Sequence, residues 1–105
     1  MNVKHFIEDR LLVFEFNEEI DHHESDKIRK RADYEIQRLM PQKVIFDFKN
    51  VKFMDSAGIG LVIGRYKNIR CYGGDIEIIN ANNKLEKIFE MSGLKRFIKE
   101  EKSNE

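Results

Sequence analysis

The chain has 105 residues, which is enough for one domain with a single hydrophobic core. Lysine plus arginine number 19, as do aspartate plus glutamate, and this zero net charge argues against a nucleic-acid-binding protein, which carries a basic surplus. A hydrophobic content of 41% excludes a disordered chain, and the single cysteine excludes an internal disulfide and a cysteine-rich zinc site.

The first third of the chain predicts a hairpin followed by a helix. Val3, His5 and Ile7 alternate with polar residues, residues 8–10 form a charged turn, and residues 11–16 are rich in apolar and aromatic residues, as in a pair of β-strands. Residues 24–40 then change to a helical period, with apolar residues three and four positions apart. Asp21 or Ser25 is placed to cap this helix, and Pro41 ends it.

The rest of the chain alternates strands and helices. An apolar run at 43–48 predicts a strand that is buried on both faces of a helix-covered parallel sheet. The further predicted elements are a helix after 55–58, a strand at 75–79, a helix from 82 or 83, a short apolar element at 94–98 and a frayed tail at 99–105. This order predicts an α/β fold in one domain, residues 1–105, with an antiparallel N-terminal hairpin and largely parallel remaining strands.

No stretch of the sequence is suited to export or to a membrane. Residues 1–10 are too charged for a signal peptide. The longest nearly apolar stretch, residues 57–64, is far shorter than the roughly 20 residues of a membrane-spanning helix. We therefore expect a soluble, cytoplasmic protein with no membrane partner.

The strongest candidate site is the segment 53–60, where a strand is followed by a helix. In open α/β sheets, binding sites gather where strands end and helices begin. Asp55 and Ser56 are both good N-cap residues, and a helix start stabilises negative charge, so a phosphate on Ser56 would be tolerated. Gly60 and Gly64 share the helix face of Ser56 and leave it bare for a kinase or another partner. The plainer alternative is a simple helix cap with glycines that allow close packing.

Other site chemistries lack part of their sequence pattern. His22 and His23 are adjacent, so their side chains diverge, and a surface turn is the alternative to a metal site. A serine hydrolase would carry a glycine two residues before Ser56, but Met54 occupies that position. Asp47 ends a strand, as a receiver phosphoacceptor does, yet the acidic pair near the chain start precedes a strand instead of following one. No phosphate-binding glycine loop with its lysine is present, so we expect neither a cofactor nor a metal.

The segment Phe-Met-Asp-Ser-Ala-Gly-Ile-Gly at 53–60 resembles the signature of STAS domains, in particular the bacterial anti-sigma factor antagonists. The stretches at 20–23, 64–67 and 91–94 resemble the sporulation branch, the antagonists of the anti-sigma F factor. The resemblance covers residues 2–100, nearly the whole chain. It implies a STAS-type mixed sheet and a regulator of transcription that is not an enzyme.

The resemblance further implies a partner switch. In this family the unphosphorylated antagonist binds an anti-sigma factor that is also a serine kinase, with ATP or ADP bound by that partner, and the sigma factor is freed. The kinase then phosphorylates the antagonist, which lets go, and a serine phosphatase restores it. The phosphoacceptor position falls on Ser56, and Ala57 replaces a second hydroxyl residue that members often carry. The partner surface implied by the family comprises Asp21, Asp55, Ser56, Ala57, Gly58 and Gly60.

Two alternative functions are left open by the sequence. One is a STAS module in another partner-switching system, such as the general stress response. The other, from a different class, is a small serine hydrolase that uses Ser56 and needs a base within about 2.6–3.2 Å of its hydroxyl.

Overall fold

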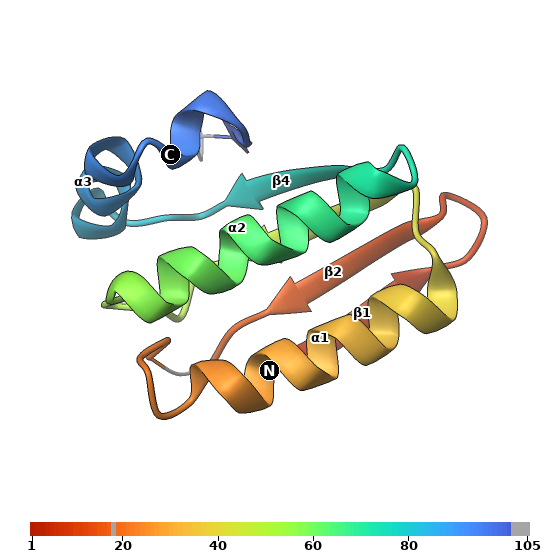
Figure 1. The fold of residues 1–105 in the computed structure, drawn as a ribbon, viewed down its shortest axis with the longest axis horizontal. Helices are drawn as coiled ribbons and strands as arrows, with labels where there is room; N and C mark the ends of the chain where they lie inside the picture. The colour runs from red at the N-terminus through yellow and green to blue at the C-terminus, as the bar shows by residue number, and fades with distance from the viewer. Residues whose placement is uncertain (18, 102–105) are drawn as a thin grey trace.

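The computed structural model of the protein describes residues 1–17 and 19–101, and within them one mixed sheet is packed against helices (Figure 1). The strands are β1 (Asn2–Phe6), β2 (Leu11–Glu15), β3 (Lys43–Asp47), β4 (Asp75–Ile79) and β5 (Lys99–Glu101), in that spatial order. The helices are α1 (Ser25–Leu39), α2 (Ser56–Cys71) and α3 (Asn83–Ser92), with a 3-10 turn, η1, at Leu94–Arg96. β1 pairs antiparallel with β2 and every later pair is parallel, which confirms the predicted mixed sheet.

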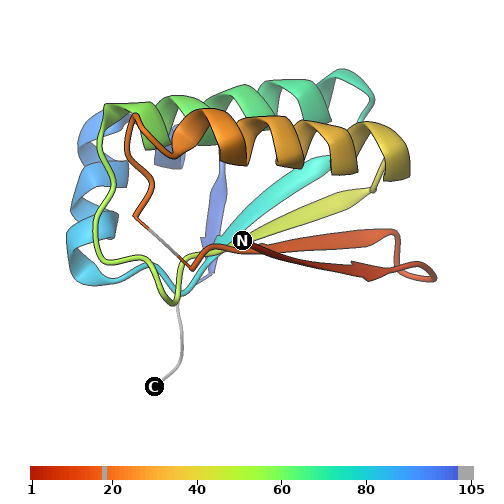
Figure 2. The same ribbon diagram turned by 90° about the horizontal axis from the view of Figure 1, so that it is seen from below.

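The helices α1 and α2 lie side by side on one face of the sheet (Figure 2). Strand register places Phe14 opposite Phe46 and Phe46 opposite Ile78, and all three are buried beneath these helices. The alternate residues Val13 and Ile45 stay half-buried on the other face, so the prediction of a strand buried on both faces is wrong. Right-handed crossovers between strands in consecutive order put both helices on the same side, which leaves the opposite face uncovered.

The core is rich in aromatic residues. Five fully buried phenylalanines connect β2, β3 and their following loops to α3: Phe14, Phe16, Phe46, Phe48 and Phe89. Several of their ring pairs are tilted or edge-on with centroids between 5.4 and 5.7 Å apart, a favoured geometry for aromatic pairs. This core fixes the carboxyl ends of β2 and β3, and the loops that follow these two strands lead to the candidate site.

Helix α1 begins differently from the prediction. Its N-cap residue is Glu24, which makes no side-chain capping hydrogen bond, and Ser25 is already helical. Asp21 instead closes the preceding turn, because its Oδ1 accepts hydrogen bonds from the backbone N–H groups of His23 and Glu24, each at 3.0 Å. The predicted capping by Asp21 or Ser25 is therefore wrong, although Asp21 does order the approach to the helix.

The C-terminal segment also differs from the prediction. The apolar stretch at 94–98 forms η1 and buries Leu94 and Ile98, while the strand follows it at 99–101. The backbone of β5 pairs with β4, so the segment expected to be a frayed tail from residue 99 begins as a paired strand. Charged residues are common on edge strands, where the backbone decides the pairing, and hydropathy therefore gave no signal. Residues 102–105 of the predicted tail lie outside the described residues.

Candidate functional site

The start of α2 shows which of the two candidate N-cap residues, Asp55 or Ser56, caps the helix. Asp55 is the N-cap of α2, and its Oδ1 accepts hydrogen bonds from the backbone N–H groups of Ala57 at 2.8 Å and Gly58 at 3.3 Å. These bonds satisfy two donors that the first turn of a helix leaves unpaired. Ser56 is then the first helical residue and is exposed. Its hydroxyl makes no hydrogen bond to any residue in the described part of the chain.

The structure brings the Asp21 loop beside the start of α2. Ile20 and Met54 form a parallel β-bridge, and the backbone N–H of Asp55 donates to the carbonyl of Ile20 at 3.4 Å. The imidazole Nδ1 of His22 lies 3.8 Å from Oδ2 of Asp55. The segments at 20–22 and 54–56 therefore lie side by side.

The carboxyl group of Asp21 is held in its charged form. The hydrogen bond from the backbone N–H of Glu24 is the main reason why the pKa of Asp21 lies below its ordinary value. Partial burial opposes this effect, and the hydrogen bond from His23 and the charges of His22 and His23 add to it. The surface thus presents acidic groups beside a hydroxyl at the positive end of a helix.

The glycines after Ser56 differ in their surroundings. A Cβ at Gly58 would lie 2.2 Å from Cγ of Met54 and 2.8 Å from the carbonyl oxygen of Ile20, so only glycine fits there. A Cβ at Gly60 or Gly64 would meet no atom within 4 Å outside the helix's own backbone. Gly58 therefore lets α2 approach the Ile20–Met54 bridge, whereas Gly60 and Gly64 leave open space above the helix.

An apolar groove of about 350 Å³ adjoins Ser56, between α2 and α3. Its lining residues are Met54, Asp55, Ser56, Ile59, Ile88, Met91 and Ser92. The Met91 side chain is 88% exposed at its edge. The sequence did not reveal this groove, because helical periodicity does not show where two helices leave a hollow between them. The exposed methionine at the end of α3 is the signal that the sequence offered.

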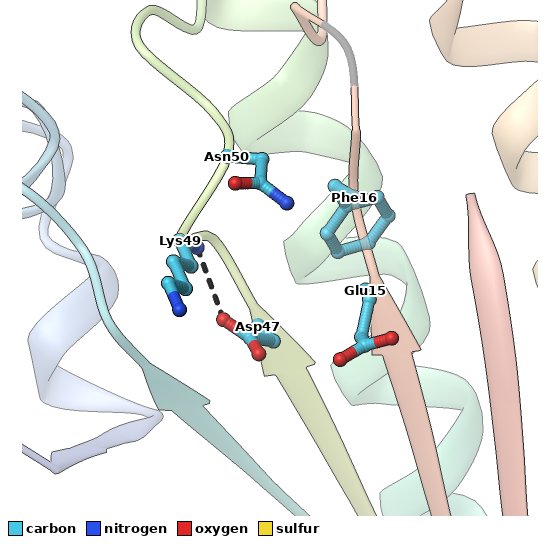
Figure 3. Close-up of a pocket in the computed structure, with 5 residues that line it drawn as sticks. All are labelled: Glu15, Phe16, Asp47, Lys49 and Asn50. Atoms are coloured by element: carbon cyan, nitrogen blue, oxygen red, sulfur yellow. Dashed lines mark hydrogen bonds between the residues drawn. The ribbon is translucent and has the colours of Figure 1, made fainter.

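The other candidate residues are not brought together into a reactive site. Asp47 Oδ1 accepts hydrogen bonds from the backbone N–H of Lys49 and from Nδ2 of Asn80, both at 3.0 Å. It lines a shallow hollow with Glu15 and Asn50 at the ends of β2 and β3 (Figure 3), where it orders the turn after β3. The described residues hold no group of three or more acidic, histidine or cysteine side chains that could bind a metal ion. No helix among them has the length and apolar character needed to cross a membrane.

Comparisons with known proteins place the chain among regulatory domains. A family model described as the STAS domain matches residues 3–105. The anti-sigma F factor antagonist of Paenibacillus polymyxa is 38% identical over 84 residues, which are 80% of this chain and 72% of that protein. The anti-sigma-B factor antagonist of Bacillus subtilis is 36% identical over 50 residues, which are 48% of this chain and 46% of that protein.

A solved structure shares the fold over nearly the full length. The Bacillus cell fate determinant SpoIIAA in its phosphorylated form aligns with a TM-score of 0.75 and 27% identity. The alignment covers 99% of this chain and 91% of that one. The chain is therefore similar to a protein whose phosphorylated form has the same architecture.

Proposed function

From the premise that this chain belongs to the STAS-domain anti-sigma factor antagonists, we propose that it binds an anti-sigma factor through the surface around Ser56 and that phosphorylation of Ser56 ends the binding. Members of this family are non-enzymatic regulatory proteins that act by partner switching. The observation that carries the proposal is the exposed Ser56 hydroxyl at the first position of α2, with the N-cap bonds supplied by Asp55 instead.

The residues of the proposed partner surface lie around the start of α2. Asp55 precedes Ser56 and is joined to the loop of Asp21 by the hydrogen bond to Ile20, and Ala57 and Gly60 follow Ser56 along α2. Gly58 is buried, so it supports this surface from below by allowing the close approach to Ile20. The apolar groove beside Ser56 adds a hollow that a partner side chain can fill, which favours protein binding over small-molecule chemistry at this point.

The charge balance at the helix start supports a local switch. A phosphate on Ser56 adds about 1.5 to 2 negative charges. The positive end of the helix stabilises this charge by only about 0.3–1 kcal/mol. The carboxylate of Asp55 adds a like charge beside it. The fold therefore tolerates the phosphate, but a partner that covers Ser56 would have to strip water from this charge, which costs several kcal/mol.

The partners follow from the same proposal. The anti-sigma factor serves as the serine kinase and supplies the ATP that it binds, and a serine phosphatase regenerates the free hydroxyl in the cytoplasm. We favour the sporulation sigma F system over the stress-response sigma B system. The anti-sigma F factor antagonist of Paenibacillus polymyxa is 38% identical over 84 residues, whereas the anti-sigma-B factor antagonist of Listeria monocytogenes is 26% identical over 81.

The test compares Ser56→Ala with Ser92→Ala, a matched change of a second hydroxyl on the same groove. Each protein is incubated with a sigma F or a sigma B anti-sigma factor and ATP, then analysed by intact mass and by binding. We expect the unchanged protein and the Ser92 variant to gain one phosphate, about 80 Da, and to dissociate. The Ser56 variant should bind and stay bound without any gain in mass.

Two results would count against the proposal. Phosphate on the Ser56→Ala protein would place the modified residue elsewhere. Failure of the unchanged protein to bind either anti-sigma factor would reject both switching systems as its function.

A further inference from the structure

A second cleft, of about 160 Å³, lies between α1 and α2. Its α1 wall includes Ser25, Asp26 and Arg29, and its α2 wall includes Ala57, Gly60 and Arg65. Ala57 and Gly60 are in the first turns after Ser56, so the cleft opens beside the proposed partner surface. It lies on the α1 side of α2, whereas the apolar groove lies on the α3 side.

Arg65 is a buried cation with unused hydrogen-bond donors. The residue is only 7% exposed, and its Nε and Nη1 atoms have no hydrogen-bond partner among the described residues. Nε lies 2.8 Å from Oδ1 of Asp33, which gives charge contact without the geometry of a hydrogen bond. Buried donors are almost always paired in folded proteins, so the two unpaired donors of this cleft-lining residue indicate a missing acceptor.

The neighbouring charges leave room for one negative group. Arg29 is ion-paired with Asp26 at 2.5 Å and lies 4.0 Å from Asp33, and Lys30 lies 3.2 Å from Asp26. Three cations, Arg29, Lys30 and Arg65, therefore share two carboxylates, those of Asp26 and Asp33. One positive charge is therefore in excess. A singly charged anion would neutralise it, whereas a phosphate dianion would leave a net negative charge.

We propose that this cleft binds one carboxylate side chain, an aspartate or a glutamate, of the anti-sigma factor. The carboxylate would accept hydrogen bonds from the guanidinium groups of Arg65 and Arg29, whose planar arrangement of donors suits a carboxylate. This inference rests on the proposed function, because it supplies a second contact for the same partner.

The size and shape of the cleft support a side chain as its occupant. Pockets for small molecules and cofactors usually measure about 300–1,000 Å³, so this one is too small for a nucleotide. Gly60 carries no side chain and has open space above it, so the main chain of a partner can come close. An acidic residue on that partner main chain would then reach Arg65.

The test measures the affinity of the anti-sigma factor for Arg29→Gln, Arg65→Gln and a control, Arg38→Gln. Arg38 is an α1 arginine that pairs with Glu35 outside the cleft. We expect the affinity to fall at least about 30-fold for the Arg65 variant, as for a buried charge pair that loses one member. For the exposed Arg29 we expect a fall of about 5-fold, and for Arg38 less than about 2-fold. If Arg65→Gln does not fold, the Arg29 and Arg38 variants still decide the question.

A second experiment probes the site without the partner. Sodium propionate, sodium phosphate and sodium chloride are titrated into arginine-labelled protein while the Nε–H signal of Arg65 is followed by NMR. We expect saturable shifts with propionate and none with chloride. Saturation by phosphate at lower concentrations than propionate would overturn the assignment to a carboxylate.

The outcomes separate this inference from the proposed function. If the unchanged protein binds its partner and all three arginine variants bind equally well, the carboxylate site is rejected and the proposed function stands. If no partner binds the unchanged protein, the proposed function fails, and the propionate titration alone decides whether the cleft accepts a carboxylate.

Discussion

Replacing Gly58 or Gly60 by alanine is expected to change stability in opposite directions, although the two glycines are only two positions apart. A methyl group at Gly58 would lie 2.2 Å from Cγ of Met54 and 2.8 Å from the carbonyl oxygen of Ile20. Met54 is 1% exposed and Ile20 0%, so neither can move into solvent without opening the core. At Gly60 the same methyl group would meet nothing within 4 Å outside the helix's own backbone.

The magnitudes follow from these surroundings. Alanine in place of an interior helical glycine is worth about 0.5–1 kcal/mol, and Gly60→Ala should gain this amount. Gly58→Ala gains the same propensity but overpacks a filled site, which costs about 1–3 kcal/mol. The net result is a loss of up to about 2.5 kcal/mol. Because both variants gain the same helix propensity, their free energies of unfolding should differ by the overpacking cost alone, about 1–3 kcal/mol.

Urea unfolding followed by circular dichroism measures this difference, with Gly64→Ala as a second variant at an open position. Thermal midpoints should separate by about 4 °C or more for a domain of this size. If Gly58→Ala proved as stable as Gly60→Ala, the close packing of α2 on the Ile20–Met54 bridge would be wrong. The juxtaposition of the Asp21 loop and Ser56 would then lose its basis.

Three further outcomes concern the same helix start and its neighbouring loop. Asp55→Ala should cost about 1 kcal/mol of unfolding free energy, because two backbone N–H groups lose their acceptor, while Asp55→Asn should cost much less; equal losses in urea would refute the capping role. Phosphorylation of Ser56 should leave the far-ultraviolet circular dichroism unchanged, and a large loss of helical signal would contradict a local switch. The pKa of Asp21 is lowered mainly by the hydrogen bond from the backbone N–H of Glu24. The charged carboxylate therefore stabilises this turn at pH values above the ordinary pKa of aspartate, and that stabilisation is lost as the pH falls through the lowered pKa. The amide signal of His23 should titrate with a midpoint below that of a short peptide of the same sequence, and a midpoint at or above the peptide's would refute the assignment.

The sequence alone predicted the order and kind of most elements. Apolar spacing located α1, where Ile28, Ala32 and Ile36 face the core, and the chain of alternating elements predicted the mixed sheet. The segment at 53–60 also marked the candidate site, since its residue types suit a helix start. These features were predictable because periodicity and capping depend on residues that are close together in the chain.

Only the tertiary structure decided how those elements meet. Whether Asp55 or Ser56 caps α2 depends on where the backbone turns, and either residue type could do so. The need for glycine at Gly58 comes from Ile20, which reaches the site through the bridge to Met54. The unpaired donors of Arg65 arise between two helices that are far apart in the sequence. Such contacts follow from the handedness of the crossovers and the packing of α1, α2 and α3, which local sequence patterns do not encode.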